Sequence, residues 1–209
     1  MDLGSPLATV TSALDGDVLT VLATHNAAFT TGQIHRILGD FSEEGIRKVL
    51  ARLVNQGIVT ADRVGRTFAY RFNVDHLAAG PILQLARIRS TFLTSLEELL
   101  SAWAQPPLYA AVFGSVARGT MSADSDIDLL LVGDDEADDM LWSQQVADLS
   151  ATVTKWTGND ARVVEFQRSD LPGLARESVF RDVVDHGLTV AGERAWLLRQ
   201  LRLAEKAGN

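Results

Sequence analysis

Asp126 and Asp128, two aspartates separated by a single residue, are the clearest candidates for catalytic side chains. They lie between two apolar runs, residues 108–113 and residues 129–132, that each read as a buried strand. Because alternate residues of a strand point to the same face, a strand beginning here places both carboxylates side by side. Mg²⁺ is usually held by one or two carboxylates together with substrate phosphates, so the pair is suited to a magnesium-dependent reaction.

The turn between the two apolar runs is suited to binding phosphate. Glycine at position 114 lets the main chain approach a triphosphate closely. Ser115 is predicted to open a short helix whose amino-terminal end favours anions, and Arg118 lies one turn further along. The order strand, turn, short helix, strand therefore predicts phosphoryl chemistry in which paired metal ions neutralise charge on the attacking and leaving oxygens.

The pattern Gly-Ser-x-Ala-Arg-Gly, followed by Ser-Asp-Ile-Asp-Leu, resembles the signature of the DNA polymerase β-type nucleotidyltransferases, including the minimal nucleotidyltransferases. The resemblance implies a frame over residues 106–192. It also implies transfer of a nucleoside monophosphate from a triphosphate to a hydroxyl, with release of pyrophosphate and with Mg²⁺. It assigns metal binding to Asp126 and Asp128. It assigns the phosphate-binding turn to Gly114 and Ser115. The candidate nucleotide-binding residues are Gly114, Ser115, Arg118 and Ser125.

That family usually carries a third carboxylate on a later strand, which here corresponds to residues 161–166. Arg162 stands where the acid is expected. Asp160 lies one step earlier on the same strand face, and Glu165 lies on the opposite face of a regular strand. Three alternatives follow: Asp160 is the third acid, Glu165 reaches the site through a local bulge, or the third acid is absent and the site binds without turnover. Asp160 is the candidate for the base-side catalytic carboxylate.

The first part of the chain predicts three helices and a hairpin. The helices cover residues 15–23, 31–38 and 43–56, with Thr30 and Ser42 as caps of the second and third. The third helix carries an apolar stripe made of Ile46, Val49, Leu50, Leu53 and Val54. Residues 58–61 and 67–72 read as two strands, and Phe68, Tyr70 and Phe72 alternate as an inward face. This order resembles the winged helix-turn-helix domain of many bacterial transcription regulators.

Basic residues gather on this first domain although the whole chain has a net charge of −8. Residues 31–72 hold 7 basic and 4 acidic side chains, and such local asymmetry favours contact with DNA or RNA. In a winged helix the third helix enters the major groove, so its outward face and the hairpin tip are the expected contacts. The candidate nucleic-acid-binding residues are Arg47, Lys48, Arg52, Arg63 and Arg66. The alternatives are a solvated helix face or a protein-binding module.

The sequence divides into three segments: a winged helix-turn-helix domain over residues 1–75, a linker over residues 76–105, and a nucleotidyltransferase domain over residues 106–209. In the linker, Pro81 suits a first helical turn, and an apolar stripe continues to Trp103, which predicts one long helix. Such a helix serves either as a spacer packed on its own domains or as the contact of a homodimer.

Composition limits the remaining possibilities. The 209 residues are 46% hydrophobic and 22% charged, which is typical of a globular protein. Cysteine is absent, so disulfides, thiolate metal sites and a cysteine nucleophile are excluded. No apolar run approaches the ~20 residues that span a bilayer, and no signal peptide is recognisable, so a cytoplasmic protein without membrane contact is expected.

The predicted fold class is α+β: an N-terminal winged helix-turn-helix followed by a mixed β-sheet of nucleotidyltransferase type with flanking helices. The predicted function is an enzyme, a Mg²⁺-dependent nucleotidyltransferase acting on an unknown hydroxyl acceptor. One alternative is a non-catalytic winged-helix regulator whose second domain binds nucleotide or forms a dimer. A further alternative is an antitoxin-like modifier of a partner protein.

Overall fold

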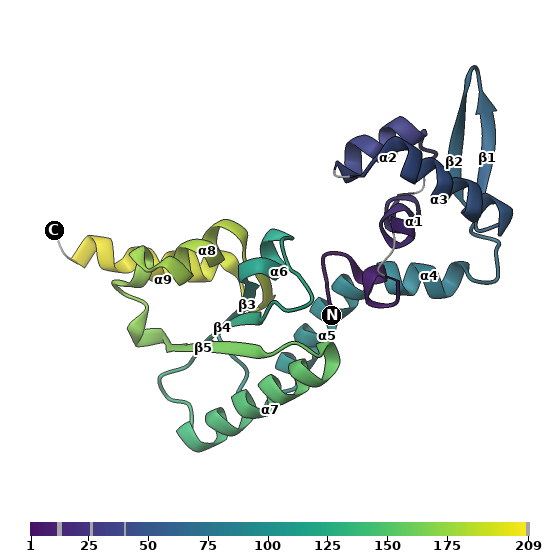
Figure 1. Ribbon diagram of the computed structural model, residues 1–209. Helices are drawn as coiled ribbons and strands as arrows, with labels where there is room; N and C mark the ends of the chain where they lie inside the picture. Colours follow the sequence, from purple (N-terminus) through teal and green to yellow (C-terminus); the bar gives the residue numbers. More distant parts are fainter. Residues whose placement is uncertain (12–13, 26, 40, 208–209) are drawn as a thin grey trace. The chain divides into compact units, whose positions relative to one another are not determined.

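The computed structural model describes residues 1–11, 14–25, 27–39 and 41–207, with the side chains of residues 203–207 left aside (Figure 1). The chain forms two compact units. The N-terminal unit comprises Gly4–Ser90 with Asp2, and the C-terminal unit begins at Thr91 and includes Met1 and Leu3. None of the described helices combines the length and the apolar character needed to cross a lipid bilayer.

The N-terminal unit contains the predicted helices and hairpin. Its elements are the 3₁₀ helix η1 (Pro6–Thr9), α1 (Leu14–Thr24), α2 (Thr31–Leu38), α3 (Glu43–Asn55), β1 (Val59–Val64), β2 (Thr67–Phe72) and α4 (Ala79–Ala86). Both predicted caps are confirmed. Thr30 and Gln33 form a reciprocal capping box at α2, and the Ser42 hydroxyl accepts from the Gly45 N–H at 3.1 Å. These caps fix where the second and third helices begin.

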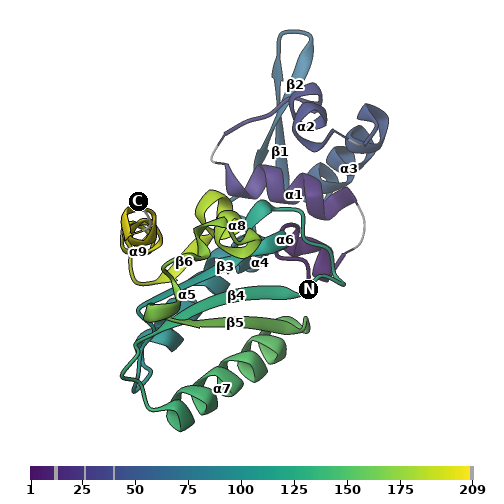
Figure 2. The same ribbon diagram turned by 90° about the vertical axis from the view of Figure 1, so that its left-hand side faces the viewer.

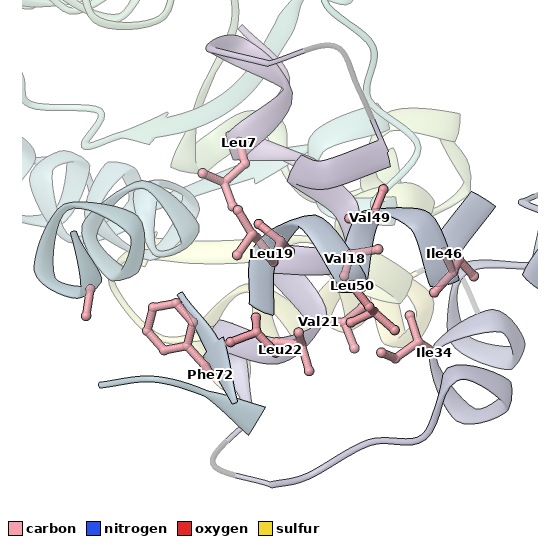
Figure 3. Packing of buried hydrophobic residues seen from close by; sticks show 13 residues of the cluster. Leu7, Val18, Leu19, Val21, Leu22, Ile34, Ile46, Val49, Leu50 and Phe72 are labelled. Atoms are coloured by element: carbon pink, nitrogen blue, oxygen red, sulfur yellow. The ribbon is translucent and has the colours of Figure 1, made fainter. Parts of the chain in front are cut away.

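A single apolar core holds the N-terminal unit together. Figure 3 shows α1 contributing Val18 and Leu22, with Ile34 from α2 and Phe72 from β2 beside them. The predicted stripe of α3 is confirmed, because its first four members are buried in this core: Ile46, Val49, Leu50 and Leu53. The inward face predicted for the hairpin is wrong at its outer end, where Phe68 is 49% exposed. The tip of β1–β2 extends beyond the helices of its own unit, so only the base of the hairpin is covered (Figure 1).

The predicted long helix from Pro81 to Trp103 is two helices, and the prediction of one is wrong. α4 ends at Ala86 and α5 runs from Ile88 to Ser101, with Arg87 between them outside helical geometry (φ −98°, ψ 6°). The α4 residues Ile82, Leu83 and Leu85 pack on the N-terminal core. The buried α5 residues are Phe92, Leu96 and Leu100. Because a break of one residue barely shifts a helical stripe, periodicity alone did not show it.

The C-terminal unit is built on a four-stranded mixed sheet. Its strands are β3 (Tyr109–Phe113), β4 (Ile127–Gly133), β5 (Ala161–Gln167) and β6 (Leu188–Ala191), in the spatial order β5-β4-β3-β6. β4 and β5 are parallel, whereas β3 pairs antiparallel with both β4 and β6. The other elements are α6 (Gly114–Arg118), α7 (Asp139–Thr157), η2 (Arg168–Asp170), η3 (Leu174–Arg176), α8 (Ser178–His186) and α9 (Arg194–Ala207).

Helices cover both faces of this sheet. α7 lies on one face, and α8 and α9 lie on the other (Figures 1 and 2). On the α8 face, Phe180 and Val183 pack against Leu130 of β4 in one buried cluster. On the opposite face, Trp142, Val146, Leu149 and Val153 of α7 are buried, whereas Trp156 in the last turn is 42% exposed. The observed class is α+β, as the sequence predicts.

Candidate functional site

The pairing of β3 with β4 brings the two halves of the sequence motif together. Phe113, the last residue of β3, is opposite Asp128, the second residue of β4. The next residue, Gly114, adopts φ 69°, a conformation that residues with a Cβ rarely adopt. A Cβ added at Gly114 would overlap the Asp128 carboxylate, lying 3.1 Å from its Cγ. Glycine is therefore required for two separate reasons at the point where the turn contacts the aspartate.

Asp128 lies on the strand face that α8 covers, and Asp126 directly precedes the first residue of β4. Asp128 has the same parity on β4 as Leu130 and Val132, which pack on Phe180 of α8. Burial, and next the neighbouring Asp126 carboxylate, raise the pKa of Asp128 above its ordinary value, while two nearby arginines partly oppose the rise. A partly buried carboxylate that is repelled by a second one is a site that a cation would stabilise.

Arg162 occupies the strand position at which the sequence predicts a third acid. The parallel register pairs Asp128 with Arg162. The Arg162 guanidinium forms an ion pair with Asp126 at 2.8 Å (Nη2 to Oδ2). The bulge that would bring Glu165 into the site is absent, because the β4–β5 register is continuous over both strands. Glu165 instead accepts a hydrogen bond from the Trp142 indole at 2.7 Å on the α7 face, so its candidacy as third acid is wrong.

Asp160 directly precedes β5 and is exposed. Its backbone carbonyl accepts from the Ile127 N–H at 2.8 Å, which extends the parallel pairing to the residue between the two aspartates. Asp160 is therefore held beside the aspartate pair through its backbone. This position is compatible with the predicted base-side role, which stays a prediction.

Asp182 of α8 joins the site, and sequence reasoning missed it. Its carboxylate accepts from the Gly114 N–H at 3.0 Å (Oδ2) and from Nη1 of Arg118 at 2.6 and 2.7 Å (Oδ1 and Oδ2). Burial opposes ionisation of Asp182, but the hydrogen bonds from Arg118 and Gly114 outweigh it and lower the pKa of Asp182. No motif marks this residue, because 68 positions separate it from Gly114 and only the packing of α8 brings them together.

The loop before the aspartates is anchored by Asn159, a second residue that sequence reasoning did not assign. Its buried side-chain amide donates to the backbone carbonyls of Ala123 and Ser125 at 2.8 Å each. The Ser125 hydroxyl accepts from the Ser122 N–H at 2.9 Å, so the predicted nucleotide-binding serine closes its own loop. Ser115 lies in the first turn of α6, where its backbone carbonyl accepts from the Thr120 N–H at 3.0 Å.

The donor set fits a magnesium ion only in company with a ligand. Among the residues that the structure describes, no group of three or more histidine, cysteine, aspartate or glutamate side chains is arranged to hold a metal. Asp126 and Asp128 offer carboxylate oxygens, which Mg²⁺ accepts together with phosphate oxygens and water. The raised pKa of Asp128 is consistent with this fit, because a cation would relieve the repulsion between the two carboxylates.

On the N-terminal unit, the predicted nucleic-acid-binding residues differ in how freely their charges are presented. Arg47 and Lys48 both pair with Glu44 of α3, at 2.7 and 3.9 Å. The Arg52 side chain forms an ion pair with Asp15 of α1, with Nε donating at 3.0 Å, so part of its donor capacity is used inside the unit. Arg63 and Arg66 lie on the exposed end of the hairpin. The hairpin arginines are therefore the more available pair.

Comparison with known families agrees with this architecture. Residues 91–182 match the family model described as Nucleotidyltransferase domain. Residues 11–106 match the family model described as Penicillinase repressor. The N-terminal part of the chain is therefore similar to a repressor winged helix, and the C-terminal part is similar to a nucleotidyltransferase domain. The two matches have the order along the chain that the sequence predicts. The match to the nucleotidyltransferase model contains Gly114, both aspartates and Asp182.

Solved structures similar to this chain include toxin–antitoxin complexes. One is described as a toxin–antitoxin with AMP-PNP: it has 18% identity and a TM-score of 0.40, covering 56% of this chain and 86% of that chain. Another is a tri-AMPylated Shewanella oneidensis HEPN toxin in complex with an MNT antitoxin, with 15% identity and a TM-score of 0.36, covering 57% and 85%. None of the curated proteins compared with the chain matches it.

Proposed function

We propose that the C-terminal domain is a nucleotidyltransferase that moves a nucleoside monophosphate from a triphosphate to a hydroxyl acceptor. The observation that carries the proposal is the contact between the turn at Gly114 and the Asp128 carboxylate. A triphosphate held at this turn would lie directly beside the carboxylates of Asp126 and Asp128. The match to the nucleotidyltransferase family model supports the same reaction class.

One group of residues would contact the phosphates, and a second group would hold the metal. Gly114 and Ser115 provide main-chain contacts to the phosphates, and the Arg118 guanidinium offers a fork of donors suited to phosphate oxygens. Asp126 and Asp128 would hold Mg²⁺ by their carboxylate oxygens. The metal supplies charge neutralisation on the transferred phosphoryl group. Asp160, which directly precedes β5 and lies beside the aspartate pair, is the proposed base-side carboxylate for the attacking hydroxyl.

Calorimetric binding tests this proposal without knowledge of the acceptor. Each nucleoside triphosphate is titrated with and without Mg²⁺ into the wild type, an Asp126→Asn/Asp128→Asn double variant, and Asp124→Asn. Asp124 is an exposed acid of the same loop and makes a matched control. We expect metal-dependent binding that the double variant loses and the control keeps. A folded wild type that binds no triphosphate would show that the domain is not a working transferase.

We propose in addition that the winged helix binds DNA, mainly through its hairpin. The exposed arginines Arg63 and Arg66, in a segment with a local excess of basic residues, support this contact. Phosphate contacts release counterions, so removing one of them lowers the salt dependence of binding by about one unit of slope. Fluorescence anisotropy with duplex DNA at several salt concentrations would show this change for Arg66→Gln. The change in the salt dependence of DNA binding should be much smaller for Arg52→Gln, because Arg52 is paired with Asp15.

The arginine at position 162 favours one alternative, a regulator whose second domain binds nucleotide without transfer. That alternative predicts metal-dependent triphosphate binding and a DNA footprint, with no release of pyrophosphate in the presence of any hydroxyl acceptor.

The antitoxin-like alternative is the case in which the hydroxyl acceptor belongs to a partner protein. It predicts a mass increase of one nucleoside monophosphate on a partner protein, lost in the Asp126→Asn/Asp128→Asn variant. Intact-mass spectrometry of the two proteins after incubation with triphosphate separates these outcomes.

A further inference from the structure

One carboxylate engages the donors that the proposed function assigns to phosphate. Nη1 of Arg118 approaches both oxygens of Asp182, and the Gly114 N–H donates to one of them. A phosphate group bound at this turn would accept from the same two donors, since arginine and backbone N–H groups are its usual partners. The Asp182 carboxylate therefore stands where a phosphate is expected, with a charge of the same sign.

We propose that Asp182 is an internal anion that holds Arg118 and the turn at Gly114 in place, and that a triphosphate must displace it in order to bind. The inference rests on the proposed function, because it concerns access to the same site. It makes Asp182 a positioning residue of the free protein and a competitor of the substrate. The site is then selective for ligands that carry enough negative charge to replace a carboxylate held by three hydrogen bonds.

The packing of α8 determines how the displacement occurs. Phe180 and Val183, on either side of Asp182, are fully buried in the cluster on the sheet, so the helix itself is fixed. The Asp182 side chain keeps 21% of its surface exposed. A change of side-chain rotamer toward solvent is therefore sufficient, and no movement of the helix is required. His186, one turn along the same helix, lies with Nδ1 3.5 Å from Oδ1 of Asp182.

A role for Asp182 as a third metal ligand is less consistent with the geometry. Within the described residues, Asp182 does not form with Asp126 and Asp128 a group arranged to hold a metal. Its oxygens already accept from Arg118 and Gly114, donors that repel a cation from the same position. The contact thus serves to neutralise Arg118 while no anion is bound, and its removal leaves a positive charge free to attract one.

Binding of tripolyphosphate and of ATP, each with and without Mg²⁺, tests the proposal in three variants. Asp182→Asn removes the charge but keeps the side-chain size. Asp185→Asn makes the same charge change on the same helix at an exposed residue, and so corrects for the general effect of net charge on anion affinity. The Asp182→Asn/Arg118→Gln double variant shows whether the effect passes through Arg118. Melting curves of all variants confirm that the domain stays folded.

We expect Asp182→Asn to bind metal-free tripolyphosphate about tenfold more tightly than Asp185→Asn, with the gain lost in the double variant. Equal or weaker binding by Asp182→Asn would overturn the proposal and make the residue a simple support for the turn. If the wild type binds Mg–ATP but Asp182→Asn gains nothing, this inference fails and the proposed function stands. If tripolyphosphate binding rises through Arg118 but no variant ever transfers a nucleotide, the inference stands and the transferase assignment fails.

Discussion

Replacing Gly114 with alanine tests whether the contact between the turn and the aspartate limits the site. At φ 69° an alanine costs about 1–2 kcal/mol of backbone strain. Its Cβ would also overlap the Asp128 carboxylate, and moving that side chain off its rotamer adds about 1 kcal/mol. We therefore expect the C-terminal unit to lose about 2–3 kcal/mol of unfolding free energy and its Tm to fall by roughly 10 °C.

Gly119→Ala is the matched control, since Gly119 has φ 70° and its added Cβ would meet nothing within 4 Å. Both variants share the backbone strain and the reduced freedom of the unfolded chain, so their difference isolates the overlap with Asp128. Differential scanning calorimetry measures the stabilities, and Mg²⁺-dependent triphosphate titration should detect a defect in Gly114→Ala alone. Equal losses of stability and of binding in the two variants would refute the reasoning.

Three other substitutions or conditions give measurable results. Asp128→Asn should raise the unfolding free energy at pH 7 in thermal melts, because the raised pKa of Asp128 means that its charged form is disfavoured by folding. The pKa of Asp182 is lowered, so its contribution to stability is present above about pH 4 and is lost as the pH falls further. In urea unfolding, the decrease in unfolding free energy from pH 7 to pH 3 should be smaller for Asp182→Asn than for the wild type. Phe180→Ala should cost about 3–5 kcal/mol in the same urea assay.

Sequence patterns predicted the elements that present the site because those patterns are local. Thr30 and Ser42 marked the beginnings of two helices through short-range hydrogen bonds. The alternation around Asp126 and Asp128 predicted a strand with both carboxylates on one face, and Asp128 lies in β4 whereas Asp126 directly precedes its first residue, Ile127. Each of these signals depends on residues within a few positions of one another, so no tertiary information was needed.

The residues that complete the site were not predictable in the same way. Asp182 reaches Gly114 and Arg118 only because Phe180 and Val183 fix α8 on the sheet, which no spacing rule encodes. Asn159 belongs to none of the motifs read from the sequence, yet its amide closes the loop at Ser125 across 34 positions. The break at Arg87 was hidden because the apolar stripe continues on both sides of it. Long-range packing decided the positions of Asp182 and Asn159.

The parallel register of β4 and β5 places the site one substitution away from a different charge state. Since Arg162 lies opposite Asp128 in continuous pairing, an Arg162→Asp change would need no rearrangement of the backbone. It would replace the cation now paired with Asp126 by a third acid on neighbouring strands. Gain or loss of an acid at position 162 in such a protein can therefore follow from one substitution on an otherwise unchanged scaffold.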